Sequence, residues 1–277
     1  MLEPNNNIGA CSDRDDLSLD SNLKVCVDLD SSKRYVSLWI YYAAISVPLA
    51  VVLMPLFADL YLAADKAWGF PLIFKFLFGA FATQILLVTG VLGTYLIFSG
   101  QYSNWRDEFY LKNWKWSHLF FGPTLACLAF IPLTLVSVIS YFSIEFIKAN
   151  IPKQFLKFFE SKYQLQEYLL NLDWKFFIIF AFAAVVVAPI VEETAFRNIF
   201  YRALNSKLSN GTSIFLTSFV FAMVHMNLVV FPAILLLGIL LQVVFNYKKS
   251  IYPSIFLHAS YNAISLCTIA VIKYISK

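Results

Sequence analysis

The sequence predicts an all-α membrane protein with about seven transmembrane helices, and two observations support this fold class. Hydrophobic residues make up 60% of the 277 residues and charged residues only 14%, whereas soluble proteins are usually about 45–50% apolar and about 25% charged. Several apolar runs approach or exceed the roughly 18–20 residues that a helix needs to cross a bilayer. The composition is therefore typical of a multi-pass integral membrane protein.

The first half of the chain divides into a tail, a membrane region and a connector. Residues 1–34 are rich in Asp, Ser and Asn and poor in large apolar residues, which predicts a disordered N-terminal tail. Residues 35–150 are expected to hold three transmembrane helices, over about 35–58, 76–98 and 119–144. Residues 151–174 mix apolar side chains at helical spacing with lysines, which indicates either an interfacial amphipathic connector or a helix packed against others.

Four further membrane helices are expected in residues 175–277. One begins at about Phe176 and is expected to bend at Pro189. The apolar stretch 213–245 is too long for one helix and has the length of two short ones, broken near Asn227 and Pro232. The last helix is expected over 251–275.

Two adjacent carboxylates and an arginine, Glu192, Glu193 and Arg197, follow directly on the apolar run 176–191. Ionisable groups at membrane depth are costly, so by default they indicate a functional site with a partner nearby. Glu193 and Arg197 are four residues apart, which places them on one helix face and predicts an ion pair. Glu192 lies about 100° around the helix from Glu193, so we expect Glu192 to be free for chemistry.

Two of the three histidines also lie in apolar stretches. His225 follows Phe221 by four residues, and Asn262 follows His258 by four, so each pair shares a helix face. At 1.5 Å per residue, the two histidines and Glu192 lie about 10–18 Å from helix ends on one side of the membrane. We therefore expect the acid, both imidazoles and the amide to meet in one pocket.

Such a pocket suits hydrolysis of an amide bond. A carboxylate can act as general base toward water, and a histidine beside it can share or relay the proton. An amide and a second imidazole can donate hydrogen bonds to a developing oxyanion, at roughly 3–4 kcal/mol per donor in other hydrolases. Each group alone has an ordinary explanation, since membrane histidines often bond between helices, Glu–Arg pairs are often structural, and Phe221 is expected to serve packing. Their joint occurrence favours catalysis.

With these motifs the sequence resembles the CAAX-protease and bacteriocin-processing (CPBP) intramembrane proteases, also called the abortive-infection family. Its signature is EExxxR, then FxxxH, then HxxxN on successive membrane helices, and all three are present in order over about residues 174–268. The resemblance implies that Glu192 and His225 activate the attacking water and that His258 and Asn262 stabilise the oxyanion. It implies a supporting role for Glu193 and Arg197, and a CPBP-like catalytic core over 175–277. Asn198 departs from the pattern, which commonly has glycine after the arginine.

The expected function is an intramembrane endopeptidase that cuts membrane-associated proteins or peptides with a glutamate-activated water. The expected partners are a peptide or membrane-anchored protein substrate and the lipid bilayer, and the net charge of +4 gives no reason to expect nucleic acid. The alternative is a non-catalytic membrane protein of the same fold, a transporter or a scaffold or immunity protein. A transporter would more often show an internal repeat of its helices.

The residue types of the expected site are compatible with a bound metal ion. Glu192, His225 and His258 could hold zinc with water as the fourth ligand. The sequence contains no HExxH and no cysteine or third histidine near the motifs, so the hypothesis without a cofactor is preferred. The expected location is the cytoplasmic membrane of a prokaryote, with several membrane passes.

Overall fold

The computed structural model describes residues 38–69, 72–98, 110–111, 113–150, 169–225 and 227–276. Within these ranges all regular secondary structure is helical, as the composition predicts. The predicted tail and residues 151–168 of the predicted connector lie outside the described residues, so both stay predictions.

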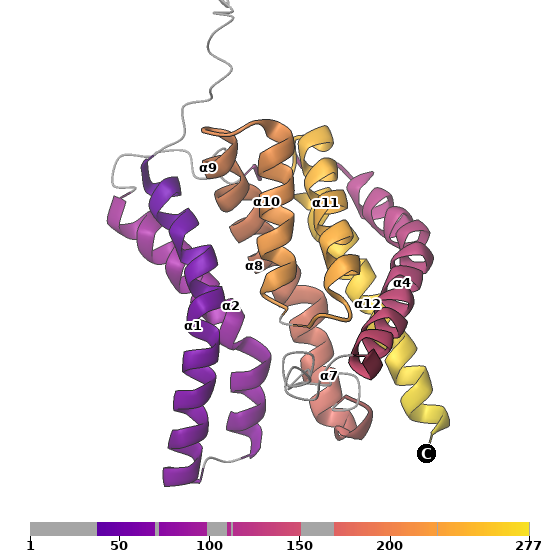
Figure 1. The fold of residues 1–277 in the computed structure, drawn as a ribbon. Coiled ribbons are helices and arrows are strands. Elements are labelled where there is room, and N and C mark those ends of the chain that lie inside the picture. Colours follow the sequence, from indigo (N-terminus) through magenta and orange to yellow (C-terminus); the bar gives the residue numbers. More distant parts are fainter. Residues whose placement is uncertain are drawn as a thin grey trace, which may run out of the picture. The chain divides into compact units, whose positions relative to one another are not determined.

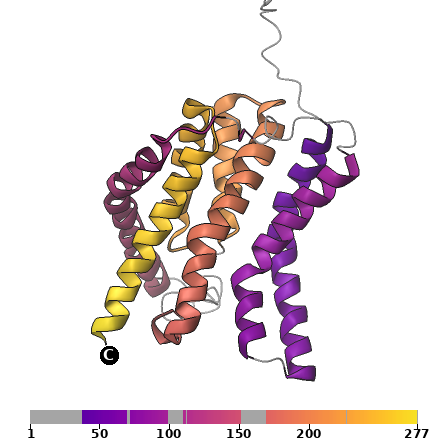
Figure 2. The same cartoon turned by 180° about the vertical axis from the view of Figure 1, so that it is seen from behind.

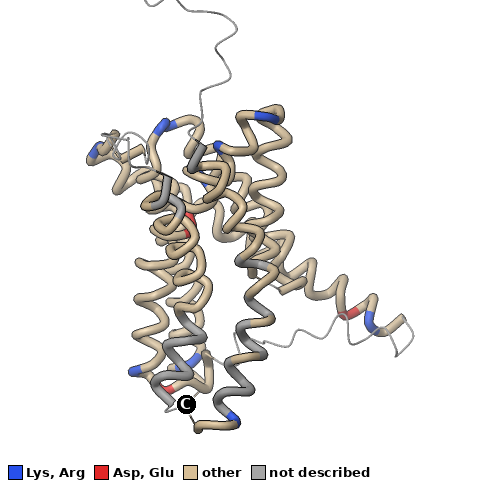
Figure 3. Tube along the Cα trace, turned by 90° about the vertical axis from the view of Figure 1, so that its left-hand side faces the viewer, with Lys and Arg blue, Asp and Glu red and all other residues tan. Residues whose placement is uncertain are grey.

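The helix lengths fit a membrane protein. Four helices are long and apolar enough to cross a bilayer by length and composition: α4 (His118–Asn150), the composite helix Trp174–Asn205, α11 (Phe231–Lys248) and α12 (Tyr252–Ile275). In three more helices, the apolar part that the structure describes is shorter than this: α1 (Leu38–Trp68), α2 (Leu72–Phe98) and α10 (Asn210–Met223). Four helices in the described part of the chain thus meet both criteria, and the predicted number of seven transmembrane helices is not confirmed. Lys and Arg are concentrated toward the helix ends, and long middle stretches carry no charge (Figure 3).

The helix boundaries follow local sequence signals. Ser209 accepts a hydrogen bond from the backbone of Thr212 and caps α10, as serine commonly does at this position. The predicted break after α10 is confirmed, because α11 begins at Phe231 with Pro232 in its first turn. Lys249 ends α11 in the left-handed conformation, with φ of 50°. The predicted ranges were too short for α1 and α4, since the apolar run marks only the part of a helix that needs lipid.

The composite helix Trp174–Asn205 alternates between α and π geometry. Its successive parts are α7 (Trp174–Phe182), η2 (Ala183–Val187), α8 (Ala188–Glu193), η3 (Thr194–Phe200) and α9 (Tyr201–Asn205). Where a bend is expected, Pro189 lies in the first turn of α8, directly after the π turn η2. π turns are rare and frequently mark functional sites. Here two of them enclose the segment that carries Glu192 and Glu193.

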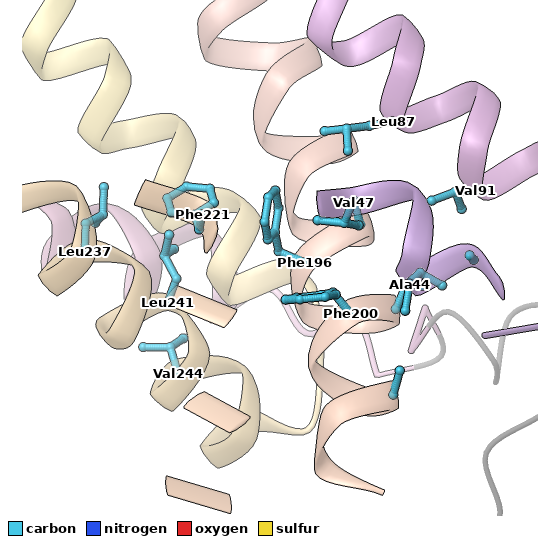
Figure 4. Close-up of a cluster of buried hydrophobic side chains, with 14 of the residues drawn as sticks. Ala44, Val47, Leu87, Val91, Phe196, Phe200, Phe221, Leu237, Leu241 and Val244 are labelled. Carbon is cyan, nitrogen blue, oxygen red and sulfur yellow. The ribbon is translucent and has the colours of Figure 1, made fainter. Parts of the chain in front are cut away.

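The helices pack in pairs around this composite helix (Figures 1 and 2). α12 packs against α4, α10 against α11, and α1 against α2, and α12 also contacts α8 and η2. Gly122 allows α4 to approach α12 closely, because a Cβ atom there would lie 2.7 Å from the backbone nitrogen of Leu257. The core between α1, α2, η3, α10 and α11 is apolar (Figure 4) and includes Ala44, Leu87, Phe196, Phe221 and Leu241.

Candidate active site

The two glutamates lie at the end of α8, and both are buried. Glu193 is fully buried and Glu192 is 8% exposed. Neither carboxylate is therefore exposed on the surface of the helices. Burial of two adjacent acids is costly unless partners compensate for it, so the partners of each carboxylate define what it can do.

Glu193 is held on both oxygens by basic groups. Its Oε2 atom accepts a hydrogen bond from Nε of Arg197 at 3.0 Å, and its Oε1 atom accepts one from Nη2 at 3.4 Å. The ion pair that the four-residue spacing predicts is therefore present, with both side chains fully buried. The Oε1 atom of Glu193 also lies 3.0 Å from Nδ1 of His258. Because an ionised carboxylate only accepts hydrogen bonds, Nδ1 of His258 carries the hydrogen.

Glu192 has one satisfied and one unsatisfied oxygen. Its Oε1 atom accepts a hydrogen bond of 3.3 Å from Nε2 of Gln84, which lies on α2. Its Oε2 atom is buried without a hydrogen-bond partner and lies 3.9 Å from Nε2 of His258. That distance is too long for a direct hydrogen bond. The unpaired carboxylate oxygen and one imidazole nitrogen therefore lie near each other without a direct bond.

Phe221 packs at the centre of these groups. Its ring is fully buried, and its centroid lies 5.1 Å from that of His225 and 5.6 Å from that of His258. The guanidinium of Arg197 lies over the same ring at 4.6 Å, a cation–π contact. The expectation that Phe221 serves packing is confirmed, and the packing holds the members of the site around one aromatic ring.

His225 lies two residues after the end of α10, and the residue is exposed. Its Nδ1 atom lies 2.8 Å from the carbonyl oxygen of Phe221. A carbonyl oxygen only accepts, so Nδ1 carries the hydrogen and Nε2 is left as an acceptor when the ring is neutral. The predicted cooperation of His225 with Glu192 stays a prediction.

Asn262 is placed differently from the other candidates. Its Nδ2 atom donates a hydrogen bond of 2.8 Å to the carbonyl oxygen of Ala184, in the π turn η2. In this turn the backbone N–H of Ala188 bonds to the carbonyl of Ala183, five residues earlier. The next donor in that pattern would be the amide of Pro189, which has no hydrogen. Asn262 therefore bonds to the carbonyl that the proline leaves without a partner.

The structure thus brings Glu192, Glu193, Arg197 and His258 into one cluster, with His225 adjoining through Phe221. The chain positions that sequence reasoning missed are Gln84 and Ala184. A single glutamine within an apolar helix is a signal for Gln84, since polar groups at membrane depth usually have a partner. For the backbone carbonyl of Ala184, the signal in the sequence is its position five residues before Pro189.

The described residues do not provide a metal site as they stand. No three side chains of the His, Cys, Asp or Glu type are placed to share one ion in the part of the chain that the structure describes. Zinc sites in enzymes have three protein ligands and a water. Glu192, His225 and His258 are not placed as such a set in the described part of the chain, and the preference for a mechanism without a cofactor stays a prediction.

Comparison with known families supports the resemblance found in the motifs. Residues 174–264 match the family model described as type II CAAX prenyl endopeptidase Rce1-like. The matched range contains all three motifs, including His258 and Asn262, and covers the composite helix, α10 and α11 in full. No curated protein and no solved structure matches the chain in such comparisons. The match shows that this part of the chain is similar to CAAX prenyl endopeptidases of the Rce1-like type.

Proposed function

We propose that this chain, whose residues 174–264 carry the CAAX-protease segment of the CPBP family, is an intramembrane endopeptidase that uses Glu192 to activate water. The observation that carries the proposal is the Oε2 atom of Glu192, which is buried, has no hydrogen-bond partner and lies 3.9 Å from Nε2 of His258. A buried acceptor without a partner is costly. A water between these two atoms removes that cost and is placed for proton transfer.

The charges of the cluster formed by Glu192, Glu193, Arg197 and His258 favour one additional proton that two of its groups can share. Glu192 and Glu193 bring two carboxylates, and Arg197 brings one permanent positive charge. Because an unbalanced charge is unfavourable in a medium of low dielectric, one further proton stabilises the cluster. Oε2 of Glu192 and Nε2 of His258 are the two acceptors that can share it, since both lie next to the proposed water.

The reaction follows from these groups. Glu192 takes a proton from the water as the water oxygen bonds to the peptide carbonyl carbon. The tetrahedral intermediate then breaks at its C–N bond, and the proton passes to the leaving amine. One amide and one water thus yield one carboxylic acid and one amine, without a metal.

The remaining residues keep the roles that the resemblance implies. His225 shares the proton of Glu192 through its Nε2 atom. His258 donates to the oxyanion from Nε2 when it holds the shared proton. The amide of Asn262 has two hydrogens, and the one that does not bond to Ala184 is available to the same oxyanion. Glu193 and Arg197 hold His258 in its tautomer, as an orienting acid does in other hydrolases.

The substrate class is a membrane-associated protein or peptide, because the cluster lies within helices suited to the bilayer. The family description names a prenyl endopeptidase, so a peptide that ends in a farnesylated cysteine and three further residues is the first probe. The same peptide without the prenyl group is the second. Both are presented to the full chain in liposomes.

The test compares wild type with Glu192→Ala and Glu193→Gln, with cleavage and accumulation in the membrane measured for each. We expect wild type to cleave at least one probe, Glu192→Ala to accumulate normally without cleaving, and Glu193→Gln to lose stability as well. Cleavage by Glu192→Ala at the wild-type rate contradicts the proposal. So does a wild type that leaves both probes intact, which favours a non-catalytic protein of the same fold.

A further inference from the structure

Gln84 of α2 connects the N-terminal helices to the candidate active site. Its Nε2 atom donates to Oε1 of Glu192 at 3.3 Å, across 108 residues of sequence. The side chain is half-buried and lies in the apolar stretch Phe81–Gly93. A polar amide in such a helix is unfavourable unless it has a partner. Its partner here is the acid to which the proposed function assigns the chemistry.

The register of α2 directs Gln84 toward this acid. Leu87 and Val91 follow Gln84 by three and seven residues, so all three share one helix face. Leu87 and Val91 are buried in the same core as Ala195 and Ile199 of η3. α2 also contacts α8 and η2. The face that carries Gln84 is therefore packed against the composite helix, and the bond to Glu192 follows from this packing.

The bond makes the two oxygens of Glu192 different. Oε1 has the amide donor, whereas Oε2 has none and lies 3.9 Å from Nε2 of His258. A donor on one oxygen fixes the rotation of the carboxylate and so keeps the other oxygen toward the imidazole. A hydrogen bond to a carboxylate also favours its ionised form, which is the form that acts as a base.

Gln84 provides this donor without adding charge. Among the described residues, the charged or titratable groups around Glu192 are Glu193 on α8, Arg197 on η3, His225 after α10 and His258 on α12. Arg197 bonds to Glu193 rather than to Glu192. A second cation at Glu192 would hold both oxygens and oppose proton uptake, whereas a neutral amide leaves Oε2 able to take the proton.

We propose that Gln84 is a positioning residue that orients the Glu192 carboxylate for catalysis. The proposal rests on the proposed function. It assigns a part in the reaction to α2, which carries none of the three motifs and lies outside residues 174–264.

The test uses the full chain in liposomes with the farnesylated and non-prenylated peptides as probes. Gln84→Met keeps a similar side-chain length and removes the donor. We expect kcat to fall about 10- to 100-fold, as displacement of a reacting group does, with KM within about twofold, because Gln84 acts on the base rather than on substrate. The acidic limb of the pH–rate profile moves to higher pH, since the ionised form of Glu192 has lost a hydrogen bond.

The Gln84→Glu variant distinguishes a role of Gln84 as hydrogen-bond donor from a role in packing alone. While the two carboxyl groups share one proton, Glu at position 84 donates to Glu192, so activity approaches that of wild type. At higher pH both groups ionise and repel each other, and activity falls in a limb that wild type lacks. A side chain needed only for packing gives no such pH-dependent recovery. If Gln84→Met fails to accumulate, the profile of Gln84→Glu alone decides.

Thr89→Val is the matched control, because Thr89 is an exposed polar residue on the same helix. The pH–rate profile of Thr89→Val is expected to equal that of wild type. A Gln84→Met variant with wild-type kcat and an unmoved profile overturns the proposal, as does a Gln84→Glu variant without recovery at low pH. Glu192→Gln is measured in parallel. If it is inactive while Gln84→Met is normal, only the role of Gln84 is wrong, whereas an active Glu192→Gln refutes the proposed function itself.

Discussion

His258 lies between the two adjacent glutamates, with Nδ1 3.0 Å from Oε1 of Glu193 and Nε2 3.9 Å from Oε2 of Glu192. One ring nitrogen is therefore held by a carboxylate that Arg197 already balances. The other faces a carboxylate oxygen that has no partner. This asymmetry divides the pair of acids into one that supports the site and one that can react.

The buried ion pair of Glu193 and Arg197 is expected to be needed for stability. Arg197→Met leaves Glu193 buried without its charged partner, and loss of one member of a buried pair costs about 3–5 kcal/mol. We expect a lower unfolding temperature and reduced accumulation in the membrane. Lys148→Met is the control, because Lys148 pairs with Glu145 at the surface, where such pairs contribute about 0–1 kcal/mol. Equal unfolding temperatures for the two variants would contradict this prediction.

The close contact of α4 with α12 is expected to set the position of His258. In Gly122→Ala the added Cβ would lie 2.7 Å from the backbone nitrogen of Leu257, so α12 has to move next to His258. We expect lower kcat and a lower unfolding temperature. Gly93→Ala is the control, because a Cβ at Gly93 meets nothing within 4 Å. A Gly122→Ala enzyme as active and stable as Gly93→Ala would show that this contact is not required.

The bond from Asn262 to Ala184 is expected to depend on Pro189. Asn262→Ala leaves the carbonyl of Ala184 without its donor, and polar contacts between membrane helices contribute about 0.6–2 kcal/mol. Pro189→Ala restores a backbone N–H that can bond to the freed carbonyl. The effect of Asn262→Ala on stability should therefore be smaller in the Pro189→Ala background. A double-mutant cycle measures this coupling, and strictly additive effects would refute it.

Removal of metal is expected to leave the rate unchanged. In the proposed mechanism the base is Glu192 and the water is held by Glu192 and His258, with no ion. Cleavage is measured before and after exhaustive chelation, and again after addition of zinc. A rate lost on chelation and restored by zinc would instead indicate a metal held with Glu192, His225 and His258.

The sequence predicted the helical class and the Glu193–Arg197 pair, because apolar run length and four-residue spacing are local properties. It predicted that Glu192 and His258 come together only through motif order and estimated depth, and the 3.9 Å distance agrees with that expectation. The bond of Gln84 to Glu192 and the bond of His258 to Glu193 could not be predicted, since both depend on the packing of helices far apart in the chain. The bond from Asn262 to Ala184 was also missed, because a π turn shifts the carbonyl pattern.

Several expectations from the sequence stay predictions. The predicted tail 1–34 and residues 151–168 of the predicted connector lie outside the described residues. The expected location in the cytoplasmic membrane of a prokaryote depends on the cell rather than on helix contacts. The catalytic roles of Glu192, His225, His258 and Asn262 depend on a bound substrate.

Glu192→Gln measures the central claim most directly, because it keeps the size of the side chain and removes the base. The full-length variant and wild type are compared in liposomes with the same peptide probes, at equal amounts of folded protein. We predict that kcat falls by about 10²–10⁴-fold, the usual contribution of a general base, while KM stays within about twofold. A Glu192→Gln enzyme with kcat within about twofold of wild type would contradict the role of Glu192 as the base.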